Sequence, residues 1–210
     1  MPITHDDIYE AADALKSIGT MGLNYSLSEY DTDRYQRTLN IALKLLSKLE
    51  DRSIDVLEAE YRRDILAHVS PINGAEAAVF REGKLLLIRR KDNSLWAMPG
   101  GMIEIGEHAA LAAERELWEE TGLRGRATNM LGLFDSRFWN CKSKRQIYLH
   151  VFEVHVLEGE PTISNETLDA RFFDPSQLPP LDPCHVGRID VILKQQRGEL
   201  RIPFFDETHT

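Results

Sequence analysis

Residues 101–123 read GMIEIGEHAALAAERELWEETGL and carry the most specific pattern of the chain. The stretch contains the spacing G-x5-E-x7-R-E-(apolar)-x-E-E-x-G-(apolar), with every position filled. Glu116, Glu119 and Glu120 stand at i, i+3 and i+4, so in a helix their carboxylates share one face. Like charges crowded in this way are unfavourable unless a cation lies among them. The stretch therefore predicts a helix that presents its acids to a hard divalent cation such as Mg²⁺ or Mn²⁺.

The apolar residues around these acids indicate that the helix packs on a core. Ala110, Ala113, Leu117 and Thr121 recur at helical spacing and form a narrow stripe beside the carboxylates. Gly122 stands where a helix commonly ends in a left-handed conformation. A run of glutamates is usually a solvated helix face. Nine matched positions within 23 residues favour the metal-binding interpretation over that alternative.

Other residues of the pattern support the acids. Arg115 stands four residues before Glu119, where its guanidinium can orient that carboxylate. Glu107 falls near the predicted helix start, where negative charge is favourable. Gly100 and Gly101 follow a proline and allow close backbone approach, so one of their carbonyls can complete a metal site.

Composition and charge exclude several classes of protein. The chain has 210 residues, of which 42% are hydrophobic and 28% charged, as in an ordinary soluble globular protein. Its net charge of −9 argues against a nucleic-acid backbone as the main partner. The N-terminus lacks the apolar segment of a signal peptide, and no apolar run is long enough to span a bilayer. We therefore expect a cytoplasmic protein that binds neither nucleic acid nor membrane.

The cysteines and histidines show no metal-binding pattern. Cys141 and Cys184 form neither a metal motif nor a disulfide framework, so free thiols are expected, as in a cytoplasmic protein. His108, His150 and His155 lack the spacing of metal ligands, and we expect structural roles for them.

The first part of the chain has the pattern of helices. An amphipathic stretch over residues 8–18 is followed by a predicted loop from Gly22 to Ser28. Asp31 or Thr32 is expected to cap a second helix that runs to residue 49, and a third, shorter helix spans residues 54–65. A segment rich in turn residues, 70–74, separates this part from the next.

The second part alternates strands and helices. Strands are expected at residues 75–80, 84–90, 127–134, 146–156 and 170–173, and a last helix at 186–193. Arg81-Glu-Gly83 joins the first two strands and indicates a hairpin. This order predicts an α/β protein with a mixed sandwich, preceded by a small all-α domain.

The stretch 101–123 resembles the Nudix box, the signature of the Nudix hydrolases, which cleave nucleoside diphosphates linked to another group X. The resemblance implies the Nudix α/β/α sandwich with a mixed sheet over residues 69–204. Residues 22–25 and 31–35, before a long helix, are similar to a bacterial Nudix subgroup that includes CDP-choline and ADP-ribose pyrophosphatases. In that subgroup a helical N-terminal domain, here residues 1–68, precedes the hydrolase domain, and we expect it to serve homodimerisation and substrate selection.

The resemblance also implies roles for the acids. Glu116, Glu119 and Glu120 would hold Mg²⁺ or Mn²⁺ ions. A carbonyl of Gly100 or Gly101 would complete a metal site. Arg115 would orient the acids without binding the metal, and Glu107, near the helix start, would support the site without binding the metal.

A base, or a carboxylate that orients the attacking water, is also required. In many Nudix enzymes this residue is a glutamate outside the box. Glu166 and Asp169 are the candidates because they precede the short strand 170–173, and Glu119 is the alternative.

Four further residues are candidates for substrate binding. Arg89 and Arg90 end a strand and could meet phosphates, although a solvated strand end fits the sequence equally well. Phe138 and Trp139 could stack on a base, although aromatic residues are more common in cores. Their segment, 137–141, departs from the His- and Pro-containing stretch of the CDP-choline enzymes and leaves the substrate open.

We therefore expect a pyrophosphohydrolase that releases a nucleoside monophosphate from ADP-ribose or a CDP-alcohol. One alternative is a nucleoside triphosphate pyrophosphatase, although such enzymes are usually shorter and lack the helical extension. The other is a non-catalytic, nucleotide-sensing Nudix domain. Such domains often lose catalytic glutamates that this chain retains.

Overall fold

The computed structural model describes residues 3–63, 70–104, 106–143 and 146–206. The chain forms two compact units, Met1–Pro71 and Ile72–Thr210. Within the described residues, no helix is long and apolar enough to cross a membrane.

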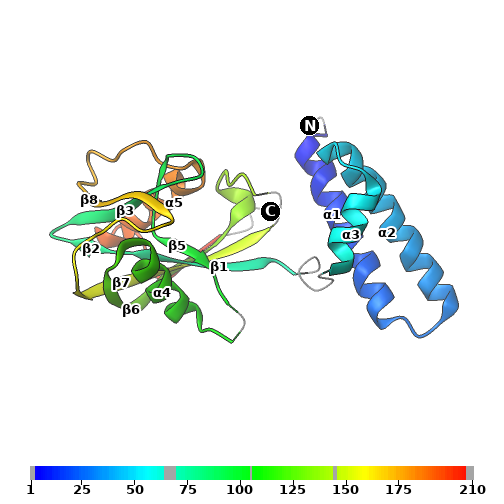
Figure 1. Cartoon of the computed structure of the whole chain (residues 1–210), viewed down its shortest axis with the longest axis horizontal. Coiled ribbons are helices and arrows are strands. Elements are labelled where there is room, and N and C mark those ends of the chain that lie inside the picture. The colour runs from blue at the N-terminus through cyan, green and yellow to red at the C-terminus, as the bar shows by residue number, and fades with distance from the viewer. Residues whose placement is uncertain (1–2, 64–69, 105, 144–145, 207–210) are drawn as a thin grey trace. The chain divides into compact units, whose positions relative to one another are not determined.

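Helices make up the described part of the first unit: α1 (His5–Tyr25), α2 (Glu29–Glu50) and α3 (Ile54–Arg63), coloured from blue to cyan in Figure 1. Helix α1 begins with a capping box. The side chain of Thr4 accepts a hydrogen bond from the backbone N–H of Asp7, and the Asp7 carboxylate accepts one from the N–H of Thr4. The hydrophobic core cluster of this unit contains the buried side chains Ala12, Leu43, Leu46 and Leu57.

Helix α1 continues through residues 22–25, which the sequence predicts as part of a loop. The glycines in this region serve helix packing. A Cβ on Gly19 would lie 2.8 Å from the backbone nitrogen of Leu39, and one on Gly22 would lie 2.1 Å from the ring of Tyr35. Because α1 and α2 approach so closely here, glycine is favoured inside the helix despite its low helix propensity.

Helix α2 begins earlier than predicted. Ser28 is its N-cap, and the Ser28 side chain accepts a hydrogen bond from the backbone N–H of Asp31 at 3.0 Å. Asp31 and Thr32, the expected caps, lie in the first turns instead. Residues 64 and 65, the end of the third predicted helix, lie outside the described residues.

The second unit alternates strands and helices. Its strands are β1 (Ile72–Ala78), β2 (Phe80–Arg81), β3 (Lys84–Arg90), β4 (Trp96–Ala97), β5 (Gly100–Met102), β6 (Arg124–Asp135), β7 (Ile147–Glu158), β8 (Thr167–Phe173) and β9 (Phe204–Phe205). Its helices are α4 (Ala109–Thr121), α5 (Pro183–Gln196) and the short 3₁₀ helix η2 (Ser136–Phe138).

The strands form two sheets with helices on both sides. The first sheet has the order β5-β1-β7-β6-β9, and the second has β2-β3-β4, with β8 also paired to β3. Strand β1 is parallel to β7 and antiparallel to β5, so the first sheet is mixed. Helix α4 packs on β1, β6 and β7 (Figure 1). Alternate residues of β1 enter different cores: Ala75 and Ala77 pack with α4, and Ala78 packs with α5. The predicted mixed α/β sandwich is confirmed.

The predicted hairpin of residues 75–80 with 84–90 is wrong in its pairing. Strand β1 pairs with β5 and β7, so both of its hydrogen-bonding edges are occupied. Only Phe80 and Arg81, after a break at Val79, pair with β3 across a turn in which Glu82 and Gly83 both have positive φ.

The expectation of free thiols is also wrong, because Cys141 and Cys184 form a disulfide. The disulfide joins the loop after η2 to the start of α5. The two cysteines are 43 residues apart in the chain, so their proximity cannot be predicted from the sequence. The pairing removes the part of the cytoplasmic prediction that depended on free thiols.

Candidate functional site

Helix α4 presents the predicted acids to strand β5. Glu116 and Glu120 are buried, whereas the Glu119 side chain is 41% exposed. The backbone N–H of Gly100 donates to Oε2 of Glu120 at 2.8 Å. A Cβ on Gly101 would lie 2.4 Å from Oε1 of Glu116, so a side chain there would have to displace this carboxylate. The Gly-Gly pair is therefore in direct contact with two of the acids.

Gly100 is the glycine of β5 whose backbone N–H and carbonyl are not used in pairing with β1. The N–H of Ala77 donates to the carbonyl of Pro99 at 2.8 Å, and the N–H of Ile103 donates to that of Asn73 at 3.0 Å. Because hydrogen-bonded positions alternate along an antiparallel ladder, Gly101 bonds to β1, and both polar groups of Gly100 point away from it. Of the two predicted carbonyl ligands, the geometry favours Gly100.

Arg115 is the centre of the hydrogen bonds around the acids. Its Nη1 donates to Glu116 at 2.8 Å and to Glu119 at 2.9 Å. Its Nε and Nη2 each reach an oxygen of Glu107 at 2.9 Å, and Nη2 also donates to the carbonyl of Met102 at 2.9 Å. The same guanidinium lowers the pKa of Glu107. Arg115 thus holds two of the predicted metal ligands, and Glu107 in turn fixes Arg115.

The electrostatics of the site oppose the ionisation of two acids. Burial raises the pKa of Glu120 to about 8, assisted by the charges of Glu116 and Glu166 and opposed by the Gly100 N–H and by Arg90. Burial also raises the pKa of Glu116, although Arg115 opposes this. A nearby cation would reverse both shifts, because it favours the charged carboxylates.

The donor atoms suit a hard divalent cation. They are carboxylate oxygens and a backbone carbonyl, the ligands that Mg²⁺ and Mn²⁺ prefer. Among the described residues, no three His, Cys, Asp or Glu side chains already converge on a metal position. Arg115 instead takes one carboxylate oxygen of Glu116 and one of Glu119, and each carboxylate has a second oxygen that could bind a cation.

Of the two predicted downstream acids, Glu166 is the one near α4. It immediately precedes β8, and its charge raises the pKa values of Glu116 and Glu120. The next residue, Thr167, donates from its hydroxyl to the backbone carbonyl of Glu120 at 3.0 Å, which fixes this end of β8 against the helix. Asp169 lies within β8 and forms an ion pair with Arg171.

The predicted arginines differ in their surroundings. Arg90 forms two hydrogen bonds with Asp92, at 3.0 and 2.8 Å, and its charge lowers the pKa of Glu120. Arg89 donates from Nε to the carbonyl of Ser94 at 3.0 Å. Of Arg89 and Arg90, Arg90 is therefore the one whose charge acts on Glu120.

The predicted aromatic residues also separate. The Trp139 ring packs edge-on against Phe134 and Phe204, and its indole N–H donates to Asp206 at 2.8 Å. These contacts hold the Trp139 ring against β6 and β9, and its stacking on a base stays a prediction. Phe138 is 63% exposed, with the guanidinium of Arg137 5.6 Å from its ring centre.

Sequence reasoning missed a buried group of charges beside β5. Glu76 lies in the apolar strand β1 and contacts Arg188 and His185 of α5, and all three are buried. A signal for it is present in the sequence. A single acid inside the otherwise apolar run 74–80 must find a charged partner if the strand is buried.

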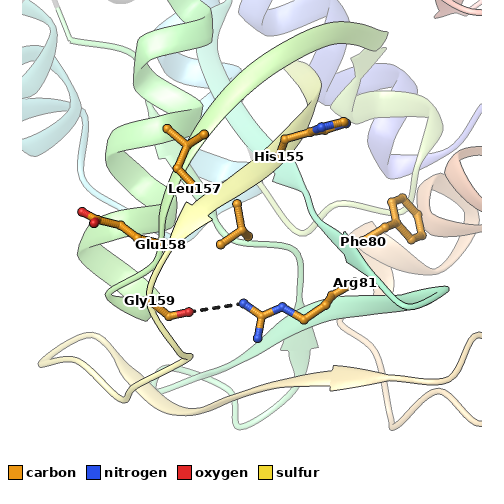
Figure 2. Close-up of a pocket in the computed structure, with 7 residues that line it drawn as sticks. Phe80, Arg81, His155, Leu157, Glu158 and Gly159 are labelled. Atoms are coloured by element: carbon orange, nitrogen blue, oxygen red, sulfur yellow. Dashed lines mark hydrogen bonds between the residues drawn. The ribbon is translucent and has the colours of Figure 1, made fainter.

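A groove elsewhere on the unit is separate from the acids. It has a volume of about 410 Å³ and lies between β2 and the end of β7 (Figure 2). Arg81 reaches across it and donates to the carbonyl of Gly159 at 3.3 Å. The α4 glutamates do not line this groove, so it is not the predicted site.

Family models match both units. Residues 72–195 match the model of the NUDIX domain. Residues 6–60 match the model described as a UDP-X-like, N-terminal oligomerisation domain.

Individual proteins are similar to this chain over most of its length. The putative ADP-ribose pyrophosphatase YjhB of Bacillus subtilis (strain 168) is 29% identical over 175 residues, covering 83% of this chain and 84% of that protein. The ADP-ribose pyrophosphatase of Methanocaldococcus jannaschii is 32% identical over 134 residues, covering 62% and 78%. The crystal structure of a UDP-X diphosphatase, at 24% identity, has a TM-score of 0.61 and covers 97% of this chain and 100% of its own. An ADP-ribose pyrophosphatase structure from Streptococcus suis 89-1591 has a TM-score of 0.58 at 27% identity and covers 65% and 100%.

Proposed function

The chain belongs to the Nudix hydrolase family and is a pyrophosphohydrolase, and from this premise we propose that it needs a divalent cation to cleave the diphosphate of a nucleoside diphosphate linked to a group X. The observation that carries the proposal is the buried carboxylate of Glu120. It accepts the Gly100 N–H at 2.8 Å and has its pKa raised to about 8. A carboxyl group that ionises near neutral pH, beside two further acids, suits the binding of a cation.

The residues of α4 and β5 would hold Mg²⁺ or Mn²⁺. Glu116, Glu119 and Glu120 supply carboxylate oxygens, and Gly100 supplies its carbonyl. When bound, such a cation supplies neutralisation of the diphosphate and activation of a water molecule. Arg115 orients Glu116 and Glu119 from one side, so the carboxylates stay close to their positions before the cation arrives.

Glu166 is the proposed base. It is the downstream acid whose charge acts on the site, and its position before β8 is fixed by Thr167. We expect Glu166→Gln to lower turnover sharply and Asp169→Asn to leave it close to that of the wild type. Full activity in both variants would assign the base to Glu119 instead.

The substrate is proposed to be ADP-ribose, a UDP-linked compound or a CDP-alcohol. The relatives and structures named above carry the names ADP-ribose pyrophosphatase or UDP-X diphosphatase. Arg90 is the proposed phosphate contact, because its charge already reaches Glu120. Stacking of a base on the exposed ring of Phe138 stays a prediction.

The deciding experiment is a substrate panel assayed with Mg²⁺ and, separately, with Mn²⁺. It contains ADP-ribose, UDP-sugars, CDP-choline, NADH, diadenosine polyphosphates and nucleoside triphosphates. We expect release of a nucleoside monophosphate from one substrate class and its loss on chelation. Preferred cleavage of triphosphates would support the second enzyme class, and no turnover with intact metal binding would support a sensor.

A matched pair of variants tests the role of α4. Glu120→Gln keeps the shape of the side chain and removes its charge, so turnover should fall by about 10²-fold or more. Glu114→Gln is the control. Glu114 lies on the same helix, but its carboxylate accepts a hydrogen bond from the N–H of Ala127 at 2.8 Å, outside the acid cluster. Unchanged turnover in Glu120→Gln would remove the assignment.

The helical unit is proposed to form a homodimer. Its matching family model is an oligomerisation domain. Ile18, Met21 and Tyr25 of α1 are exposed by 42% to 67%, which leaves apolar surface for a second copy to cover. Light scattering of the full chain should give twice the monomer mass, and a monomer would contradict the proposal.

A further inference from the structure

A buried group of charges connects strand β1 to helix α5. Arg188 is fully buried and forms an ion pair with Oε2 of Glu76. Nε2 of His185 lies 3.2 Å from Oε1 of the same carboxylate. Arg188 also donates from Nε to the carbonyl of Cys184 at 2.7 Å, so its guanidinium is fixed at the start of α5.

This group keeps Glu76 ionised in the protein interior. Burial opposes the charge most strongly, yet Arg188 and His185 together lower the pKa of Glu76 to about 2. Buried ion pairs of this kind are rarely the most stabilising choice for a core, because removing both charges from water is costly. A role beyond stability is therefore worth seeking in what the Glu76 side chain contacts.

The stem of Glu76 lies directly against Gly100. The two residues are partners in the β1–β5 ladder. A Cβ on Gly100 would lie 2.6 Å from Cγ of Glu76 and 2.6 Å from the carbonyl oxygen of Ala75. Glu76 thus covers one side of Gly100, and the Gly100 N–H reaches Glu120 at 2.8 Å. The anchored Glu76 side chain and the proposed metal site meet at one backbone residue.

Glu76 does not reach the α4 acids itself. Alternate residues of β1 face opposite sides of the sheet, and Ala75 and Ala77 are those that face α4. Both carboxylate oxygens of Glu76 are also occupied, one beside His185 and the other by Arg188. The contact with Gly100 is therefore the direct link between Glu76 and the residues around the acids.

We propose that Glu76, anchored by Arg188 and His185, is a positioning residue that fixes the backbone of Gly100 for Glu120 and for the bound cation. Strand β5 is short and lies at the edge of its sheet, so only β1 holds it through strand pairing. The anchored stem supplies the missing constraint from the α5 side. The part that concerns the cation rests on the function proposed above, whereas the part that concerns the Gly100 backbone does not.

The main test replaces the ion pair with apolar side chains of similar length, in the double variant Glu76→Met/Arg188→Met. Removing both charges avoids leaving one buried and unpaired, so the variant is expected to fold. Hydrogen exchange of the Gly100 amide is measured by NMR on the metal-free protein. We expect exchange at Gly100 to accelerate about tenfold, while amides of the central strand β7 keep their protection.

A second readout is the affinity for Mn²⁺, measured by calorimetry without substrate. We expect the dissociation constant of the double variant to rise about tenfold, as for other residues that orient metal ligands. The control is Gln195→Met, which removes a buried polar group from the same helix. Gln195 bonds to the carbonyls of Leu131 and Arg201, not to β5, so both readouts should match the wild type.

The outcomes separate the two proposals. Unchanged Gly100 exchange in a folded double variant would overturn the positioning role, whatever the metal results. Faster exchange without Mn²⁺ binding by the wild type would keep the positioning role and contradict the proposed function. If the double variant does not fold, Arg188→Lys, which keeps a positive charge beside Glu76 but cannot reproduce the Nε bond to the Cys184 carbonyl, is measured in the same way with the same expected direction.

Discussion

The carboxylate of Glu116 can lie against Gly101 because Gly101 has no side chain. A Cβ there would lie 2.4 Å from the Glu116 carboxylate, far inside van der Waals contact. We expect Gly101→Ala to displace this carboxylate and lower turnover by about 10²-fold, as a displacement of about 1 Å can do at a reaction centre. Steady-state kinetics and the melting temperature should be measured together. Near-normal turnover in the folded variant would contradict the predicted importance of this contact.

The raised pKa of Glu120 predicts how stability changes with pH. The unfolded chain releases this proton near 4.5, whereas the folded protein keeps it up to about 8. Between these values the folded state binds more protons, so raising the pH lowers the stability of the metal-free protein. Below about 4.5 this contribution is constant. The total effect is on the order of a few kcal/mol at most.

Glu120→Gln isolates this effect, because glutamine resembles the protonated acid at every pH. In the presence of chelator, we expect the variant to gain stability relative to the wild type as the pH rises from 5 to 8. The difference in melting temperature should widen by several degrees. Calorimetric scans across this range provide the measurement. A constant difference would mean that Glu120 has an ordinary pKa.

At the scale of elements, the contact between α1 and α2 depends on Gly19. A Cβ there would lie 2.8 Å from the backbone of α2, which cannot move as a flexible side chain can. We expect Gly19→Ala to destabilise the helical unit by about 1–3 kcal/mol. The same substitution at an open helix position would stabilise by up to about 1 kcal/mol. The sign of the change in urea denaturation therefore tests the close approach, with the exposed Asn24→Ala as a near-neutral control.

Local sequence signals are sufficient to predict an element whose bounds are set by its own residues. Helix α4 ends at Gly122 with φ of 71°, as the sequence predicts. The longer strands can also be located, because alternating or continuous apolar runs are local patterns, whereas β4, β5 and β9 are too short to show such a pattern and are not predicted. Strand pairing cannot be predicted in this way, since β1 lies between β5 and β7, and of the predicted strand 75–80 only Phe80, in β2, pairs with β3. The sequence places Gly22 in a loop because the ring of Tyr35 that excludes a side chain there comes from another helix.

Some residues of the candidate site could likewise be predicted from the sequence, and others could not. The acids of α4 and the glycines of β5 could be predicted, because a fixed spacing carries their chemistry. The choice of Glu166 over Asp169 required the fold, since both precede or enter the same short strand. Glu76 and Arg188 are 112 residues apart in the chain, and only the packing of α5 on β1 brings them together.

At the scale of the whole molecule, the disulfide closes a long loop. Cys141 and Cys184 are separated by 43 residues. Loop-closure entropy alone predicts that the bond stabilises the second unit by about 4 kcal/mol relative to the reduced chain. We expect a dithiol reductant to lower the melting temperature by roughly 10 °C.

Cys141→Ser provides the control for this prediction. The variant should melt at the temperature of the reduced wild type, with or without reductant. If reductant shifts the variant as much as the wild type, the disulfide is not the cause of the shift.

The final described strand, β9, has a consequence for how the hydrolase domain is delimited. The family match stops at residue 195, yet Phe204 of β9 stacks on Phe134 with ring centres 5.0 Å apart and pairs in parallel with Gly132. A protein trimmed to the homologous region would retain every proposed catalytic acid. It would nevertheless expose the aromatic cluster at the sheet edge and leave a strand open to intermolecular pairing. The segment that matches the family model is thus shorter than the folded domain, which includes β9.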